Sequence, residues 1–207
     1  MKRIDVMVDI ETLGIEPNST IFQISAACFD LASGDILNVD GEDFIFDSCA
    51  DISLQKKIDV DSSTLKWWVT KYPTMMQELM LKEGSPSPED LLRSFGHWLK
   101  SLSNFTDCNN IHLWGNGIGF DNNMLKTQMD SLKDYEYPIR YYSERDYRTV
   151  IDIAAFTLGK DRREFNEELN NEYMKTHVFS PHNAMDDVYI QIYKMSKAMK
   201  LLSGGVK

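Results

Sequence analysis

The feature that most constrains the fold is a stretch near the N-terminus, from Ile4 to Gly14, which begins with strict alternation and ends at Thr12-Leu13-Gly14. Branched aliphatic residues occupy every second position from Ile4 to Ile10, which predicts a β-strand with one face against a core. Asp9 and Glu11 share the other face, with Cα atoms about 7 Å apart at roughly 3.3 Å per residue. Paired carboxylates beside a core are costly unless a cation or proton lies between them. The stretch alone is equally compatible with a strand end whose acids point into water.

Length and composition limit the class of protein. The 207 residues suffice for one α/β domain spanning residues 1–207, and 43% hydrophobic content with 11% aromatic residues is typical of a globular protein. No apolar run approaches the roughly 20 residues of a membrane span, and the first strand begins too early for a signal peptide, so we expect no membrane partner. Three widely spaced cysteines, Cys28, Cys49 and Cys108, predict neither a disulfide framework nor a zinc site. We therefore expect a reducing, cytoplasmic compartment.

The net charge of −10 disfavours broad coating of duplex DNA, which needs a large basic surface. It leaves open an enzyme that grips one end of a nucleic acid, because acidic residues gathered at a metal site add to the negative count. The charge therefore limits the binding footprint and not the substrate class.

Hydrophobic periodicity predicts the order of the elements. Strands are expected over residues 4–12, 21–29, 36–46 (with an interruption at 40–41) and 111–114. Helices are expected over residues 61–72, 87–102, 121–129, 149–158 and 184–199. Residues 164–180 are polar and the least predictable. The order predicts a meander of three strands that begins with the carboxylate strand.

Two segments could contact nucleic acid. In the adjacent pair Trp67 and Trp68, one ring could lie beside a base, although we favour core positions for both. Positive charge gathers over residues 142–163, interleaved with tyrosines, and this mixture suits a single strand through phosphate contacts and base stacking. Salt bridges on helix surfaces are an equally compatible explanation of the same charges.

The C-terminal helix carries a second acidic signal. Its apolar stripe runs from Ala184 through Val188, and at 100° per residue Asp187 lies at the flank of that stripe while Asp186 points away into solvent. His182 precedes the helix on a loop, where an imidazole can approach a site.

The dispersed residues Asp9, Glu11, Asp121, His182 and Asp187 together resemble the DEDDh 3′-5′ exonuclease superfamily. Its motifs are D-x-E on the first strand, a later aspartate, and H-x-A-x-x-D, which residues 182–187 contain in full. Within the superfamily the chain is similar to the small branch that contains T-even-phage exonuclease A and the mycobacterial-type exoribonucleases. The supporting segments are residues 9–14, 63–68, 114–117, 120–121 and 145–149, in the same order and spread over nearly the whole chain.

The resemblance implies an α/β, RNase H-like fold: a mixed five-stranded sheet, its first three strands antiparallel, with helices on both faces. It implies 3′-5′ hydrolysis of single-stranded DNA or short RNA in a bacterial or phage-infected cell. Four carboxylates and no thiolates select two hard ions, Mg²⁺ or Mn²⁺. In the family pattern, Asp9 bridges both ions and Asp121 holds one of them. Glu11 and Asp187 complete the ligands of the other ion.

The resemblance also assigns His182 as general base, a role that fits its ordinary pKa near neutrality. Leu13 is expected to wedge against the terminal base, and the backbone of Thr12 and Leu13 to hold the 3′-hydroxyl. The expected substrate-binding residues are Thr12, Leu13, Trp68, Asn116, Phe120, Arg145 and Arg148.

The alternative function is a catalytically silent module that binds nucleic-acid ends or a replication complex on the same fold. Such a module would be expected to lack a carboxylate or the histidine, and every one is present here. A homodimer is compatible with the sequence, and the choice between DNA and RNA stays open.

Overall fold

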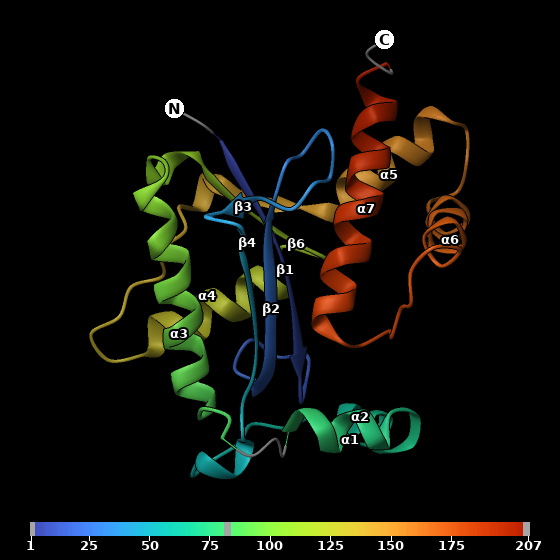
Figure 1. Cartoon of the computed structure of the whole chain (residues 1–207). Helices are drawn as coiled ribbons and strands as arrows, with labels where there is room; N and C mark the ends of the chain where they lie inside the picture. The colour runs from blue at the N-terminus through green and yellow to red at the C-terminus, as the bar shows by residue number, and fades with distance from the viewer. Residues whose placement is uncertain (1–2, 81–83, 205–207) are drawn as a thin grey trace.

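The computed structural model describes residues 3–80 and 84–204. In these residues a mixed five-stranded sheet has the strand order β5-β2-β1-β6-β7 (Figure 1). The strands are β1 (Ile4–Thr12), β2 (Ile21–Phe29), β5 (Ile45–Cys49), β6 (Ile111–Gly115) and β7 (Glu144–Asp146). The first three pair antiparallel, β6 runs parallel to β1, and β7 runs parallel to β6. This confirms the predicted α/β, RNase H-like sheet.

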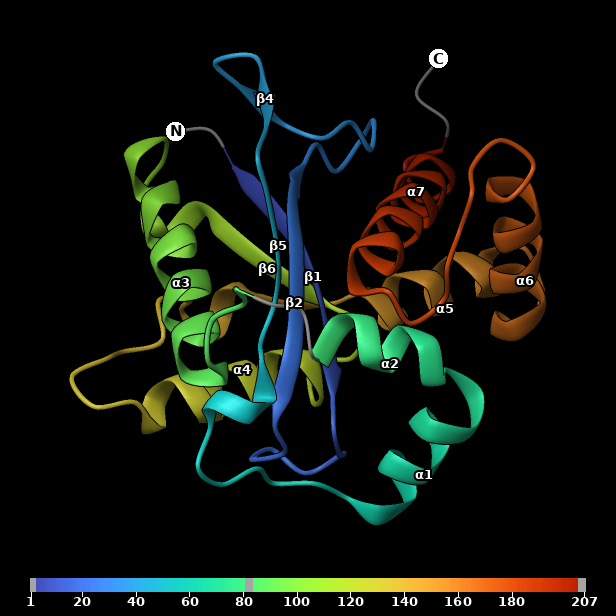
Figure 2. The same cartoon turned by 60° about the horizontal axis from the view of Figure 1, so that its bottom comes forward.

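Helices cover both faces of the sheet (Figures 1 and 2). The α3 and α4 helices lie on one face, and α5 and α7 lie on the other with α6 packed outside them. The α1 and α2 helices close the end of the sheet at which β1 ends. The α-helices are α1 (Ser62–Lys71), α2 (Pro73–Met80), α3 (Pro88–Ser101), α4 (Asp121–Ser131), α5 (Tyr147–Thr157), α6 (Arg162–Tyr173) and α7 (Ala184–Leu202). Short 3₁₀ turns span Ile52–Leu54, Leu102–Asn104, Cys108–Asn110 and Tyr141–Ser143.

The β1 strand is buried along its whole length because both of its faces are covered. Ile4, Val6, Val8 and Ile10 pack in the core that α3 and α4 cover, whereas Met7 packs in the core beneath α5 and α7. Since side chains alternate along a strand, Asp9 and Glu11 share the Met7 face and point toward α7. In the part of the chain that is described, no helix combines the length and apolar character of a membrane span.

One predicted strand needs correction, and three elements, α2, α6 and β7, were not predicted. The strand expected over 36–46 is instead a small hairpin of β3 (Asn38–Val39) and β4 (Glu42–Asp43), followed by β5. Asp40 and Gly41 both have positive φ, so the chain turns back there after a single bridge between Ile36 and Phe29 of β2. Helix α1 ends before Pro73, as expected, but a further helix, α2, begins at that proline. Proline is tolerated in the first turn of a helix because its fixed φ is already helical.

The polar stretch 164–180 contains most of α6, whose buried residues Phe165, Leu169 and Tyr173 recur every four positions. That stripe is too narrow to stand out in a segment rich in Glu and Asn. The β7 strand has three residues, too few for periodicity to reveal.

Candidate active site

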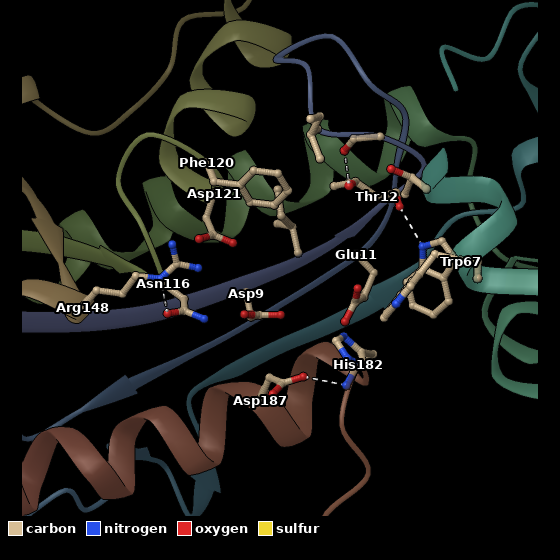
Figure 3. A pocket seen from close by; sticks show the side chains of 15 residues that line it. Asp9, Glu11, Thr12, Trp67, Asn116, Phe120, Asp121, Arg148, His182 and Asp187 are labelled. Carbon is tan, nitrogen blue, oxygen red and sulfur yellow. Dashed lines mark hydrogen bonds between the residues drawn. The ribbon is translucent and has the colours of Figure 1, made fainter. Parts of the chain in front are cut away.

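Three carboxylates converge where the C-terminal half of β1 meets the start of α7. One oxygen each from Asp9, Glu11 and Asp187 lies within 4.8 Å of the other two. Asp9 and Glu11 come from β1, and Asp187 lies in the first turn of α7, which Asn183 caps through its side chain. Two segments far apart in the sequence therefore make one acidic cluster (Figure 3).

Asp121 faces this cluster from the opposite side of one cavity of about 270 Å³. It is the first residue of α4, and Phe120 occupies the N-cap position, so Asp121 is not the cap of its helix. Gly115 allows the close packing there, because a Cβ would lie 2.2 Å from the Asn122 side chain. Oδ2 of Asp121 is buried and has no hydrogen-bond partner among the described residues.

The crowding of acids raises their pKa values. Burial, followed by the charges of Asp121 and Asp187, raises the pKa of Asp9 well above its usual range. Burial and the charge of Asp9 do the same for the pKa of Glu11. Burial raises the pKa of Asp121 to about 7 and that of Asp187 to about 6. Four such groups cannot all be ionised at neutral pH without a compensating cation. The buried, unpartnered oxygen and the all-oxygen ligand set both fit divalent metal ions.

Gln191 is a residue of this site that the sequence reasoning missed. Its Nε2 donates a hydrogen bond to Oδ1 of Asp9 at 2.8 Å, and both side chains are buried. Gln191 follows Asp187 by four residues, one helical turn, so both project from the same side of α7. That spacing is the only sequence signal that could have identified it.

The loop before α7 brings His182 to the edge of the cluster. His182 has a positive φ of 67°, and its backbone N–H donates to Oδ2 of Asp187 at 2.9 Å. Its ring packs edge-on against Trp67 and Tyr72, with centroids 4.7 and 4.8 Å away. Burial lowers the pKa of His182, which favours the neutral imidazole. Asp186 belongs to neither the acidic cluster nor the cavity lining, and it is not simply in solvent as predicted, because it is half-buried and its Oδ2 accepts a hydrogen bond from the Ser180 N–H.

The turn after β1 overturns the prediction for Leu13. Leu13 is 1% exposed and packs with Phe22 and Trp68 beneath α1, so it cannot wedge against a base. The pairing of β1 with β2 shifts register here, because Glu11 pairs with Gln23 and Thr12 with Ile21, which leaves Phe22 as an extra residue in β2. Ile15 is 69% exposed and lines the cavity instead.

The tryptophan pair divides between core and cavity. Trp68 is 1% exposed, and its Nε1 donates to the Thr12 carbonyl at 3.0 Å, which secures the end of β1. Both tryptophans line the cavity, but the ring that is open to solvent is that of Trp67, which is 37% exposed. Placing both rings in the core was therefore wrong for Trp67. Thr12 lines the cavity, and its hydroxyl donates to the Gly14 carbonyl at 2.6 Å.

At the other end the cavity is lined by Asn116, Phe120 and Arg148. Nε of Arg148 donates to Oδ1 of Asn116 at 3.1 Å (Figure 3), and the positive charge of Arg148 acts to lower the pKa of Asp9. Arg145 does not line this cavity, because its guanidinium folds back onto the carbonyls of Tyr142 and Glu144. The prediction of Arg145 as a substrate contact is not supported by this geometry.

Comparison with known proteins supplies the family context. The profile of the Rv2179c-like domain, described as a 3′-5′ exoribonuclease domain, matches residues 4–199. No curated protein sequence matches the chain.

Several solved nucleases share the fold. Cell-death related nuclease 4 (CRN-4) is 13% identical with a TM-score of 0.59, over 98% of this chain and 64% of that one. Exonuclease I of E. coli in complex with single-stranded DNA is 17% identical with a TM-score of 0.61, over 99% of this chain and 42% of that one. A full-length 3′-exonuclease is 12% identical with a TM-score of 0.57, over 98% and 83%. The chain thus spans less than two-thirds of the first two proteins, and at these identities the likeness is one of fold.

Proposed function

The chain belongs to the Rv2179c-like 3′-5′ exoribonuclease domain family, and we propose that it is a 3′-5′ exonuclease that removes nucleotides from single-stranded ends with two bound divalent metal ions. The observation that carries the proposal is the convergence of Asp9, Glu11 and Asp187 within 4.8 Å, opposite Asp121. The silent end-binding module is disfavoured because all four carboxylates and His182 line one cavity.

Mg²⁺ or Mn²⁺ fits this site because the available ligands are carboxylate oxygens. Asp9, Glu11 and Asp187 would hold one ion, and Asp121 would hold the second together with Asp9. When bound, such ions supply positive charge at the scissile phosphate and lower the pKa of water. The raised carboxylate pKa values mean that these side chains release protons as a metal binds.

His182 is suited to accept the proton of the attacking water at a ring nitrogen. Its burial favours the neutral form, and its backbone bond to Asp187 keeps the loop at the carboxylates. Trp67 and Tyr72 surround the ring, which limits the orientations that the imidazole can adopt.

The substrate is proposed to place its terminal nucleotide at the end of the cavity where the exposed ring of Trp67 lies. An exposed indole can stack on any base, so this end favours a single strand without selecting its sequence. Family membership favours RNA, whereas the E. coli exonuclease I structure with a similar fold holds single-stranded DNA.

The test is digestion of matched 5′-labelled RNA and DNA oligonucleotides with Mg²⁺ or Mn²⁺. We expect a ladder that shortens from the 3′ end, is blocked by a 3′-phosphate, and disappears in EDTA. A circular strand cut at the same rate would identify an endonuclease. Binding without cleavage of either polymer would favour the silent module, and the Asp9→Asn variant provides the background for contaminating nuclease.

A further inference from the structure

A second cavity, of about 430 Å³, adjoins the carboxylate cavity, and Asn116 and Arg148 line both. We name it the arginine cavity; its lining residues are Asn116, Tyr147, Arg148, Ile151, Arg162, Arg163 and Asn166. They come from the loop after β6, from α5 and from the first turns of α6. Its volume lies within the range of ligand pockets.

The arginines of this cavity lack carboxylate partners. None of Arg148, Arg162 and Arg163 has a described Asp or Glu oxygen within the 4.0 Å of an ion pair. The neighbouring cations Lys160 and Lys197, by contrast, are paired with Glu168 and Glu172. Three unpaired guanidiniums around one cavity are notable in a chain with a net charge of −10.

The other polar residues that line the arginine cavity present hydrogen-bond donors. Oδ1 of Asn166 accepts a bond from Nζ of the buried Lys194 at 3.0 Å, which leaves the Asn166 amide nitrogen available to donate. Tyr147 is buried, and its hydroxyl has no hydrogen-bond partner among the described residues. No carboxylate lines the cavity. Guanidiniums, an amide and a phenol together suit an anion with several oxygens.

The loop after β6 leaves space for the Arg148 side chain and is held to the helix that carries it. Gly117 has a φ of 130°, and a Cβ there would lie 3.4 Å from Nη1 of Arg148. The Asp146 side chain caps α5 and also accepts from the Ile118 N–H at 3.0 Å, which joins the loop to the helix that carries Arg148. Arg148 therefore lies at the passage between the cavities.

The order of groups along the two cavities indicates the occupant. Trp67 lies at one end, the carboxylates lie in the middle and Arg148 lies beyond them (Figure 3), and Arg148 also lines the arginine cavity together with Arg162 and Arg163. An exonuclease that holds the terminal nucleotide at the first end must direct the rest of the strand past the carboxylates. We propose that the arginine cavity binds the phosphodiester backbone on the 5′ side of the scissile bond, so that the enzyme distinguishes a strand from a dinucleotide; this rests on the proposed exonuclease function.

The test is the double variant Arg162→Ala/Arg163→Ala, assayed on single strands of two, four and ten nucleotides. We expect kcat/KM for the ten-nucleotide strand to fall about 10- to 100-fold, mainly through KM, with the dinucleotide rate within about twofold of the parent. The slope of log affinity against log salt for the long strand should decrease by about 1.4, the value for two lost phosphate contacts on single-stranded nucleic acid.

The matched control is Lys133→Ala/Arg140→Ala, which removes the same charge beside α3 and α4, on the other face of the sheet. An equal loss in this control would show general charge attraction and overturn the proposal. A length-independent loss in the test variant, or no loss at any length, would also overturn it. If the parent cleaves none of the strands, the proposed exonuclease function is wrong, but this result does not test the arginine cavity. Binding of the ten-nucleotide strand to the parent and to the same two double variants, measured by fluorescence anisotropy in EDTA, then tests the cavity separately.

Discussion

Gln191 on α7 holds the carboxylate of Asp9 on β1 through a buried hydrogen bond of 2.8 Å. The same helix carries Asp187 one turn earlier, so α7 supplies one acid of the cluster and orients another. A residue that hydrogen-bonds to a metal-binding carboxylate fixes the direction of the ligand oxygen. Loss of such a residue commonly lowers metal affinity or activity 10- to 100-fold.

The Gln191→Leu variant is expected to lower kcat/KM about 10- to 100-fold and to raise the metal concentration needed for half-maximal rate. Leucine has nearly the same volume but cannot donate to Asp9, so the carboxylate loses its fixed orientation. A metal titration of the rate measures both effects. The control is Gln77→Leu, the same change at an exposed position on α2, which should behave as the parent. If Gln191→Leu needs no more metal than the parent, Gln191 does not orient Asp9 for metal binding.

The two neighbouring aspartates should separate clearly. Asp187→Asn is expected to lose about 10³-fold or more in rate, because it removes a charge from the metal cluster. Asp186→Asn should stay within a few-fold, since an amide oxygen can still accept from the Ser180 N–H. Initial rates of both purified variants measure the difference. A large loss of rate in Asp186→Asn would contradict the assignment of Asp187 as the metal-binding aspartate.

Metal removal should make stability depend on pH. The pKa values of Asp187 and Asp121 are raised to about 6 and about 7, so the folded metal-free protein binds more protons than the unfolded chain between pH 4 and 7. Its free energy of unfolding must therefore fall as pH rises through this window. We expect Mn²⁺ or Mg²⁺ to raise Tm more at pH 7.5 than at pH 5, as measured by calorimetry in EDTA and in metal. Equal shifts at both pH values would argue that the ions bind elsewhere.

The test of His182 uses His182→Asn, because asparagine tolerates the positive φ found at this position. The backbone bond to Asp187 should persist while the base is lost, so the rate should fall about 10²- to 10⁴-fold with little change in Tm. The residual rate should rise with pH, as hydroxide replaces the missing base. A parallel loss of Tm and rate would instead identify a structural residue within the ring contacts of Trp67 and Tyr72.

The tryptophans should respond in opposite ways. Trp67→Ala is expected to raise KM for single strands about 5- to 100-fold, the value of one base stack, with a small change in Tm. Trp68→Ala should cost about 3 to 5 kcal/mol of unfolding free energy, because it empties a core site and releases the Thr12 carbonyl. Urea denaturation and oligonucleotide kinetics on both variants make the comparison. A stable Trp68→Ala with raised KM would reverse the assignment.

Local patterns were sufficient for most of the architecture. The alternation from Ile4 to Ile10 identified β1, and the phase of α7 separated Asp187 from Asp186, because both depend only on the geometry of one element. The three residues of β7 are too few to show a repeating pattern, and α6 was hidden by its narrow apolar stripe.

The sequence by itself determined the central strand, the set of acids and the family resemblance, since each resides in residues close together or in short motifs. Only the tertiary structure decided which side chains meet. Packing against Phe22 and Trp68 buried Leu13 while Ile15 stayed exposed, and the packing of α7 on β1 brought Gln191 to Asp9 across 182 positions of sequence. The fold of the loop after β6 likewise brought Arg148 to Asn116. Such contacts depend on how elements pack and on local register shifts, and neither is encoded in the periodicity of a single segment.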